Sequence, residues 1–328
     1  DDNGKKNHIE MVDYKPFKPY RSVDLNYFRE ARKGFTTEEW VDFLLSAMEY
    51  DAEGFDSLTQ KVEFLTRLLI FLEPRLNVIE LAPKGTGKSF VFGNMSKYGW
   101  LVSGGKVTRA KLFFDKTKQQ PGIIKNHDFT AFDEIQTITF QEPSEIQAAL
   151  KSYLESGKTT IDNYEFSSEC GLMLMGNIPL TKDRRPMSST YFDALPRYFR
   201  ESALLDRFHC FIEGWILPKI HKGMIFNGWT INVEYFSEIL HALRTDNIYN
   251  QLFDQIVESQ KDAYIRDFNA VKRVAVAYMK LLFPHWRTVE DVDKDDFETF
   301  CLEPAIRRRG IVKEQCHRID PEFPATMP

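Results

Sequence analysis

The pattern of apolar and polar positions changes period along this chain, and the changes predict the order of its elements. Short apolar runs rich in β-formers predict five buried parallel strands, at residues 76–81, 100–103, 129–133, 172–176 and 209–213. Apolar residues spaced three and four apart predict helices at residues 35–51, 57–73 and 144–155. Strands that alternate with helices indicate an α/β fold built on a parallel sheet.

Two of these helix starts carry a capping-box pattern, in which a hydroxyl residue is followed three positions later by Glu or Gln. Thr36 is followed by Glu39, and Ser144 is followed by Gln147. Between the third helix and the fourth strand, residues 158–169 alternate enough to predict a β-hairpin with Asp162-Asn163 near its turn. A plain surface hairpin is the alternative interpretation of that segment.

The pattern becomes wholly helical from about residue 231, which predicts a second, all-helical region. We therefore expect a linker at 1–22, a helical segment at 23–75, an α/β nucleotide-binding domain at 76–218, a helical lid domain at 219–319 and a tail at 320–328. The prolines and polar residues of the first twenty positions support the linker.

The loop after the first strand has the chemistry of a phosphate-binding loop. It reads APKGTGKS from Ala82 to Ser89, between a predicted strand and a predicted helix, as the Walker A motif requires. Ala82 replaces the usual first glycine, and an ordinary glycine turn is the alternative. The pattern assigns Lys88 to the β- and γ-phosphates and Ser89 to Mg²⁺. The candidate nucleotide contacts of this loop are Pro83, Lys84, Gly85, Thr86, Gly87, Lys88, Ser89 and Phe90.

An acidic pair ends the third predicted strand, where open α/β sheets bind their ligands. In this Walker B-type pattern, Asp133 would hold Mg²⁺ and Glu134 would act as general base on the attacking water. A glutamate directly after the aspartate favours a hydrolase over a kinase. The two motifs together predict a Mg²⁺-dependent ATPase.

Asn177 and Arg207 are further candidates for catalysis, and Arg273 is a further candidate for nucleotide binding. Asn177 ends the fourth strand and would hold the attacking water, although an asparagine that starts a turn is the alternative. Arg207 precedes the fifth strand and would reach the γ-phosphate of a neighbouring subunit; a local ion pair with Asp206 is the alternative. Arg273, or its neighbour Lys272, would add a cation from the lid to the nucleotide site, unless it lies on a solvated helix face.

Composition narrows the remaining classes of function. The 328 residues carry a net charge of −5, which gives no global support for nucleic-acid binding. The four cysteines are far apart and lack metal-ligand spacing, which indicates reduced thiols in a cytoplasmic protein. We find no apolar run of membrane-spanning length and no Ser/His/Asp pattern, so neither a membrane partner nor protease activity is expected of this chain.

The order of these motifs resembles the AAA+ ATPases. The stretches FTTEEWVDFLLSAMEYD, IELAPKGTGKSFVF, SGGKVTRAKLFFD and FTAFDEIQTITF more specifically resemble the BrxL family, the Lon-like ATPases of BREX (bacteriophage exclusion) antiphage defence, over about 23–319. This resemblance implies an AAA+ α/β core with a helical lid, and rings of six subunits, able to pair into a double hexamer, around double-stranded DNA. It also implies other BREX proteins as partners, and further domains before and after this core.

The resemblance also matches the 158–169 segment to a hairpin that points into the pore of replicative MCM rings. It implies phosphate contacts by Lys158, with Lys106, Arg109, Lys116 and Lys118 as further candidates. Three functions therefore stay open: an ATP-driven ring on DNA, an ATP-dependent protein unfoldase, and a nucleotide-gated scaffold.

Overall fold

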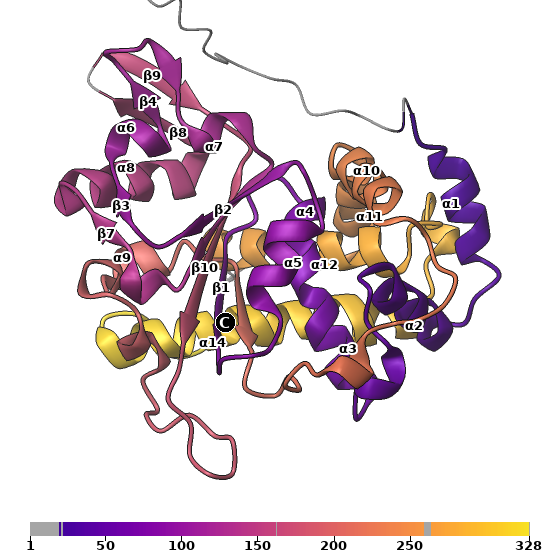
Figure 1. Cartoon of the computed structure of the whole chain (residues 1–328). Coiled ribbons are helices and arrows are strands. Elements are labelled where there is room, and N and C mark those ends of the chain that lie inside the picture. The colour runs from indigo at the N-terminus through magenta and orange to yellow at the C-terminus, as the bar shows by residue number, and fades with distance from the viewer. Residues whose placement is uncertain (1–19, 21, 162, 259–263, 328) are drawn as a thin grey trace, which may run out of the picture.

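A five-stranded parallel sheet forms the centre of the molecule and confirms the predicted α/β class (Figure 1). The computed structural model describes residues 20, 22–161, 163–258 and 264–327. The strands lie in the order β11-β1-β10-β6-β2, and every neighbouring pair is parallel. Their bounds are β1 Val78–Ala82, β2 Gly99–Ser103, β6 Phe129–Asp133, β10 Gly171–Asn177 and β11 Cys210–Glu213. All five predicted strands are present, with starts shifted by at most two residues.

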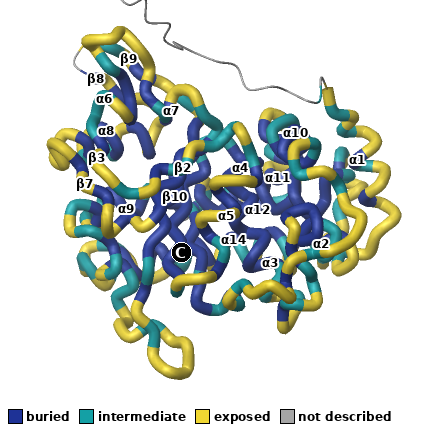
Figure 2. The backbone as a smooth tube through the Cα atoms, viewed as in Figure 1, coloured by how far each residue is buried: buried dark blue, intermediate teal, exposed yellow. Residues whose placement is uncertain are grey.

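Helices cover both faces of this sheet, and each face has its own apolar core (Figures 1 and 2). The long and medium helices are α1 Leu25–Arg32, α2 Thr37–Ala47, α3 Leu58–Leu65, α5 Lys88–Asn94, α8 Pro143–Ser156, α10 Val233–Arg244, α11 Ile248–Ile256, α12 Ile265–Leu282 and α14 Glu303–Ile319. The short ones are α4 Leu69–Leu72, α6 Arg109–Leu112, α7 Ile123–Asn126, α9 Ser202–Leu205 and α13 Lys294–Phe297.

The helices before the sheet and those after it share one core. Side chains of α2, α3 and α4 pack with those of α10 and α12 over one face, and α8 and α9 cover the other. The lid helices therefore bury their apolar stripes against the N-terminal helices and the sheet. This packing fixes α12 beside the amino-terminal end of β1.

Two predicted helix details need correction. The helix at 57–73 is interrupted by a 3₁₀ turn at Thr66–Leu68; the Thr66 hydroxyl donates to the carbonyl of Val62, a back-bond that disturbs helices. The capping box at Ser144 is absent, because α8 begins one residue earlier with Pro143 at its first position after a left-handed Glu142. The capping box of Thr36 and Glu39 is confirmed.

The predicted hairpin is present as antiparallel strands β8 Lys158–Ile161 and β9 Tyr164–Ser167. Asp162, expected near its turn, lies outside the described residues. A second short hairpin, β4 Phe114–Asp115 with β5 Gln120–Pro121, lies beside it, since the Phe114 and Tyr164 rings stack with centroids 3.9 Å apart. A small parallel ladder joins β3 Lys106–Val107 to β7 Thr139–Phe140.

Candidate nucleotide site

The phosphate loop lies at the carboxyl edge of the sheet, between β1 and α5. Gly85 and Gly87 have left-handed backbones, with φ of 85° and 80°, which side chains resist. A Cβ atom on Gly87 would lie 2.8 Å from the Tyr50 hydroxyl, so this position also lacks room for a side chain. The loop therefore has the backbone needed to turn its N–H groups toward an anion.

Lys88 is buried at the start of α5, where its ammonium donates to the carbonyls of Ala82 at 3.4 Å and Pro83 at 3.2 Å. Burial lowers the pKa of Lys88, and the carboxylates of Glu80 and Asp133 act against that shift. An anionic phosphate oxygen would be a stronger partner for this ammonium than two neutral carbonyls. The loop fits a nucleotide on this ground.

The two predicted Mg²⁺ ligands are in contact. The Ser89 hydroxyl donates to a carboxylate oxygen of Asp133 at 2.5 Å, and Asp133 is buried at the end of β6. Hard oxygen ligands of this kind suit Mg²⁺, which keeps waters and phosphate oxygens as its other ligands. The described residues hold no cluster of three or more His, Cys, Asp or Glu side chains that could bind a metal by itself.

Glu134 and Asn177 lie at the same edge of the sheet: Glu134 directly follows Asp133, and Asn177 ends β10, which lies between β1 and β6. Glu134 is exposed and has a left-handed backbone with φ of 46°, and no hydrogen bond or ion pair holds its carboxylate among the described residues. Asn177 pairs in register with Ala82, at the first position of the loop. Gln136 donates to the Asn177 carbonyl at 2.9 Å and so ties the acidic segment to this strand.

A buried ion pair supports the loop from behind, and sequence reasoning missed it. Arg67 donates to both carboxylate oxygens of Glu80 on β1, at 3.0 and 2.5 Å, and to the carbonyl of Thr86 at 2.7 Å. Both ion-pair side chains are fully buried. The available signal was Glu80 itself, since a charge inside an apolar strand needs a buried partner.

Arg207 and Arg273 lie at the opposite, amino-terminal edge of the sheet. The Arg207 carbonyl accepts from the Asn77 side chain just before β1, and Arg273 donates to the carbonyl of Pro74 at 2.6 Å. The whole of β1 therefore separates both residues from the phosphate loop of their own chain. This corrects the interpretation of Arg273, with Lys272, as a lid cation for the chain's own nucleotide.

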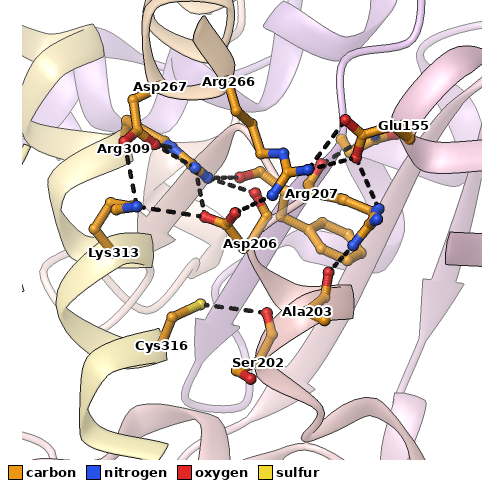
Figure 3. Close-up of polar contacts among 12 residues, drawn as sticks. Glu155, Ser202, Ala203, Asp206, Arg207, Arg266, Asp267, Arg309, Lys313 and Cys316 are labelled. Atoms are coloured by element: carbon orange, nitrogen blue, oxygen red, sulfur yellow. Dashed lines mark hydrogen bonds and ion pairs between the residues drawn. The ribbon is translucent and has the colours of Figure 1, made fainter. Parts of the chain in front are cut away.

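Within the chain, Arg207 pairs with a residue that sequence reasoning did not name. Its Nε lies 2.9 Å from a carboxylate oxygen of Glu155, and its Nη1 contacts the carbonyl of Ala203 (Figure 3). Asp206, the expected local partner, instead pairs with Arg266 and Arg309.

The candidate DNA contacts divide into two groups. Lys116 and Lys118 lie in the exposed turn between β4 and β5, a hairpin whose Phe114 stacks on Tyr164 of the β8–β9 hairpin. Lys158 lies at the base of the β8–β9 hairpin. Lys106 lies on the separate β3–β7 ladder, and Arg109 on α6 forms an ion pair with Glu145 at 2.9 Å. The structure brings only the first group together on the hairpins.

The sequence comparisons agree with this geometry. The family model described as "Lon-like protease BrxL-like, ATPase domain" matches residues 9–328. A "Lon-like protease BrxL" of Escherichia coli O9:H4 (strain HS) is 29% identical over 96% of this chain and 44% of its own length. One of Bacillus cereus (strain H3081.97) is 31% identical over 91% of this chain and 43% of its own length. The chain thus spans less than half of these relatives. No helix in its described part is long and apolar enough to cross a membrane.

Proposed function

This chain belongs to the family of BrxL-like ATPase domains, and on that premise we propose that it binds ATP with Mg²⁺ and hydrolyses it. The observation that carries the proposal is the 2.5 Å contact between Ser89 and Asp133, directly beside the phosphate loop. Bound Mg²⁺ would supply positive charge that stabilises the phosphoryl oxygens in the transition state.

The residues of the chain divide the remaining work. The loop N–H groups and Lys88 bind the phosphates, and Ser89 and Asp133 hold the metal. Glu134 takes a proton from the attacking water, since its carboxylate is exposed and has no internal partner among the described residues. Asn177 orients that water from the end of β10.

We further propose that hydrolysis is completed between the subunits of a homo-hexameric ring. Two such rings can pair into a double hexamer. Arg207 cannot reach its own phosphate loop across the sheet, yet lies in a cavity that is open at the surface. An arginine that stabilises transition-state charge in trans requires this arrangement.

The proposed substrate is double-stranded DNA. The proposed setting is a BREX-type antiphage system, in which this ATPase acts with other BREX proteins. Lys116 and Lys118 lie on one of two neighbouring hairpins that project from the sheet, and Lys158 lies at the base of the other (Figure 1). Contacts of lysine to phosphate would make binding insensitive to sequence and sensitive to salt.

The ATPase rate, measured against protein concentration with and without duplex DNA at two salt concentrations, tests these proposals together. We expect the rate to rise cooperatively with concentration and to be stimulated by DNA at low salt. A rate that is independent of both concentration and DNA would instead favour a protein substrate or a nucleotide-gated scaffold.

A further inference from the structure

A cationic cavity of about 550 Å³ opens at the amino-terminal edge of the sheet, between α12 and the last turn of α8. Two carboxylates line it, Glu73 and Glu155. Five cations line it: Arg75, Arg207, Arg266, Lys272 and Arg273. The cavity therefore has an excess of positive charge, in a protein whose net charge is −5.

Three of these cations have partners other than Glu155. Arg75 donates to the carbonyl of Ser156 at 2.7 Å and lies 3.3 Å from Glu169. Two oxygens of Asp254 accept from Lys272 at 2.5 and 2.6 Å. Glu73 lies 3.7 Å from Arg273 but only 2.9 Å from the buried Lys280. His209 adds no charge near neutral pH, since burial and the neighbouring arginines hold its pKa well below the usual range.

The two remaining guanidinium groups converge on a single carboxylate. Glu155 lies 2.9 Å from the Nε of Arg207 and 3.0 Å from a terminal nitrogen of Arg266 (Figure 3). Arg266 donates hydrogen bonds to this carboxylate, whereas the buried Nε of Arg207 is in ion-pair contact with it but has no hydrogen-bond partner among the described residues. Two guanidinium groups around one set of oxygens can also bind phosphate. The Glu155 side chain is 45% exposed, and it lies in the last turn of α8, so it can leave the cavity without breaking the core.

We propose that this cavity is a second anion site, which binds a phosphate chain, and that Glu155 competes with that chain for the site. In the conformation described, Glu155 pairs with Arg207 and with one terminal nitrogen of Arg266, whose other terminal nitrogen donates to Asp206 at 2.6 Å. An entering phosphate chain displaces Glu155 and pairs with the groups that it leaves. Anion binding here does not depend on hydrolysis. Only the identification of that phosphate chain with the nucleotide of a neighbouring copy rests on the proposed function.

Calorimetric titration with inorganic tripolyphosphate tests the site, with Lys88→Ala in every protein to weaken binding at the phosphate loop. We expect Glu155→Gln to tighten tripolyphosphate binding by about tenfold, which lies between the effect of one unit charge in bulk water and its effect near a protein surface. Glu145→Gln is the matched control, because it removes the same charge from the first turn of α8, away from the cavity. Arg207→Gln should weaken binding by about tenfold or more.

Equal affinities of the Glu155→Gln and Glu145→Gln proteins for tripolyphosphate would overturn the proposal. If Arg207→Gln fails to fold, as shown by its thermal unfolding, Arg266→Gln applies the same test. If the unmodified chain does not hydrolyse ATP, the proposed hydrolysis is rejected. The second anion site is still supported if tripolyphosphate binds as expected.

The phosphate chain could belong to the nucleotide of a neighbouring copy or to a free polyphosphate. Sedimentation of mixed proteins distinguishes these two sources. A Glu134→Gln chain loaded with ATP is mixed with the Lys88→Ala chain, with and without Glu155→Gln in the latter. Association that needs ATP and is strengthened by Glu155→Gln identifies the nucleotide of a neighbouring copy. Tripolyphosphate binding without such association identifies a free polyphosphate. Both results support the site.

Discussion

At the scale of single residues, the side chains of the candidate site differ in whether other atoms of the protein already contact them. Ser89, Asp133 and Lys88 are engaged with the protein's own atoms, at distances between 2.5 and 3.4 Å. The Glu134 carboxylate is exposed and has no such partner within the described part of the chain. A general base has to be available to water, so this difference supports the role assigned to Glu134.

Glu134→Gln should retain ATP binding and lower the turnover rate by at least about 100-fold, since the amide cannot accept the proton from water. Nucleotide affinity and steady-state hydrolysis, measured on the same preparation, check this. Lys88→Ala should lower both quantities. Normal hydrolysis by the Glu134→Gln protein would exclude Glu134 as the base.

Arg67 is expected to matter for both stability and nucleotide binding. Arg67→Met leaves the Glu80 carboxylate buried without its partner, which should cost about 3–5 kcal/mol of unfolding free energy. It also removes the donor to the Thr86 carbonyl, so ATP affinity should fall.

The double variant Arg67→Met with Glu80→Met separates these two effects. Because it buries no unpaired charge, most of the stability should return, while ATP affinity stays low. Urea denaturation and nucleotide titration measure the two quantities. Recovery of full ATP affinity in the double variant would show that Arg67 does not position the loop.

The phosphate loop and the acidic pair could be predicted from sequence because their residues are adjacent in the chain and their roles follow from local geometry. Arg67 and Glu155 could not, because each acts on a residue brought to it only by tertiary packing. Arg207 shows the limit of prediction from sequence. Asp206 is its neighbour in the chain and was the expected ion-pair partner, but Asp206 pairs with Arg266 and Arg309.

At the scale of elements, apolar runs predicted every strand of the main sheet, because buried parallel strands need continuous apolar sequence. The break in the second helix could not be predicted, because Leu65 to Leu69 keep a helical apolar pattern through the 3₁₀ turn. The pairing of the two hairpins also escaped prediction, since it depends on the contact between Phe114 and Tyr164.

Because the two hairpins lie side by side, the β4–β5 turn is a specific candidate for DNA contact. Substitution of Lys116 and Lys118 by alanine should weaken binding to duplex DNA and reduce the slope of log affinity against log salt by about 2, since each lost phosphate contact contributes about 0.9. Fluorescence anisotropy at several salt concentrations measures both. Alanine at the exposed Lys33, just after α1, and Lys294, in α13, removes the same charge and should leave the slope unchanged.

At the scale of the whole molecule, a buried network joins the helices before the sheet to those after it. Glu63 on α3 accepts two hydrogen bonds from Arg308 on α14, at 2.7 and 2.8 Å, and Arg308 also donates to Tyr278 on α12. All three side chains are buried. The network therefore fixes the lid helices against the N-terminal helices, and it should do so only while Glu63 is ionised.

Glu63→Gln should lower the unfolding free energy at pH 7 by about 3–5 kcal/mol, because it leaves Arg308 buried without its counter-charge. Burial alone would raise the pKa of Glu63, but Arg308 and then Arg307 outweigh it and hold the pKa below its ordinary value.

The stabilisation from Glu63 is therefore complete above its unfolded-state pKa, near pH 4.3, and is lost as pH falls through the lower folded-state value. The difference in stability between the unmodified chain and Glu63→Gln, measured by urea denaturation at several pH values, should be constant from pH 7 to about 5 and shrink below about 4. A difference that does not change with pH would show that the ion pair is not what joins the two helical regions.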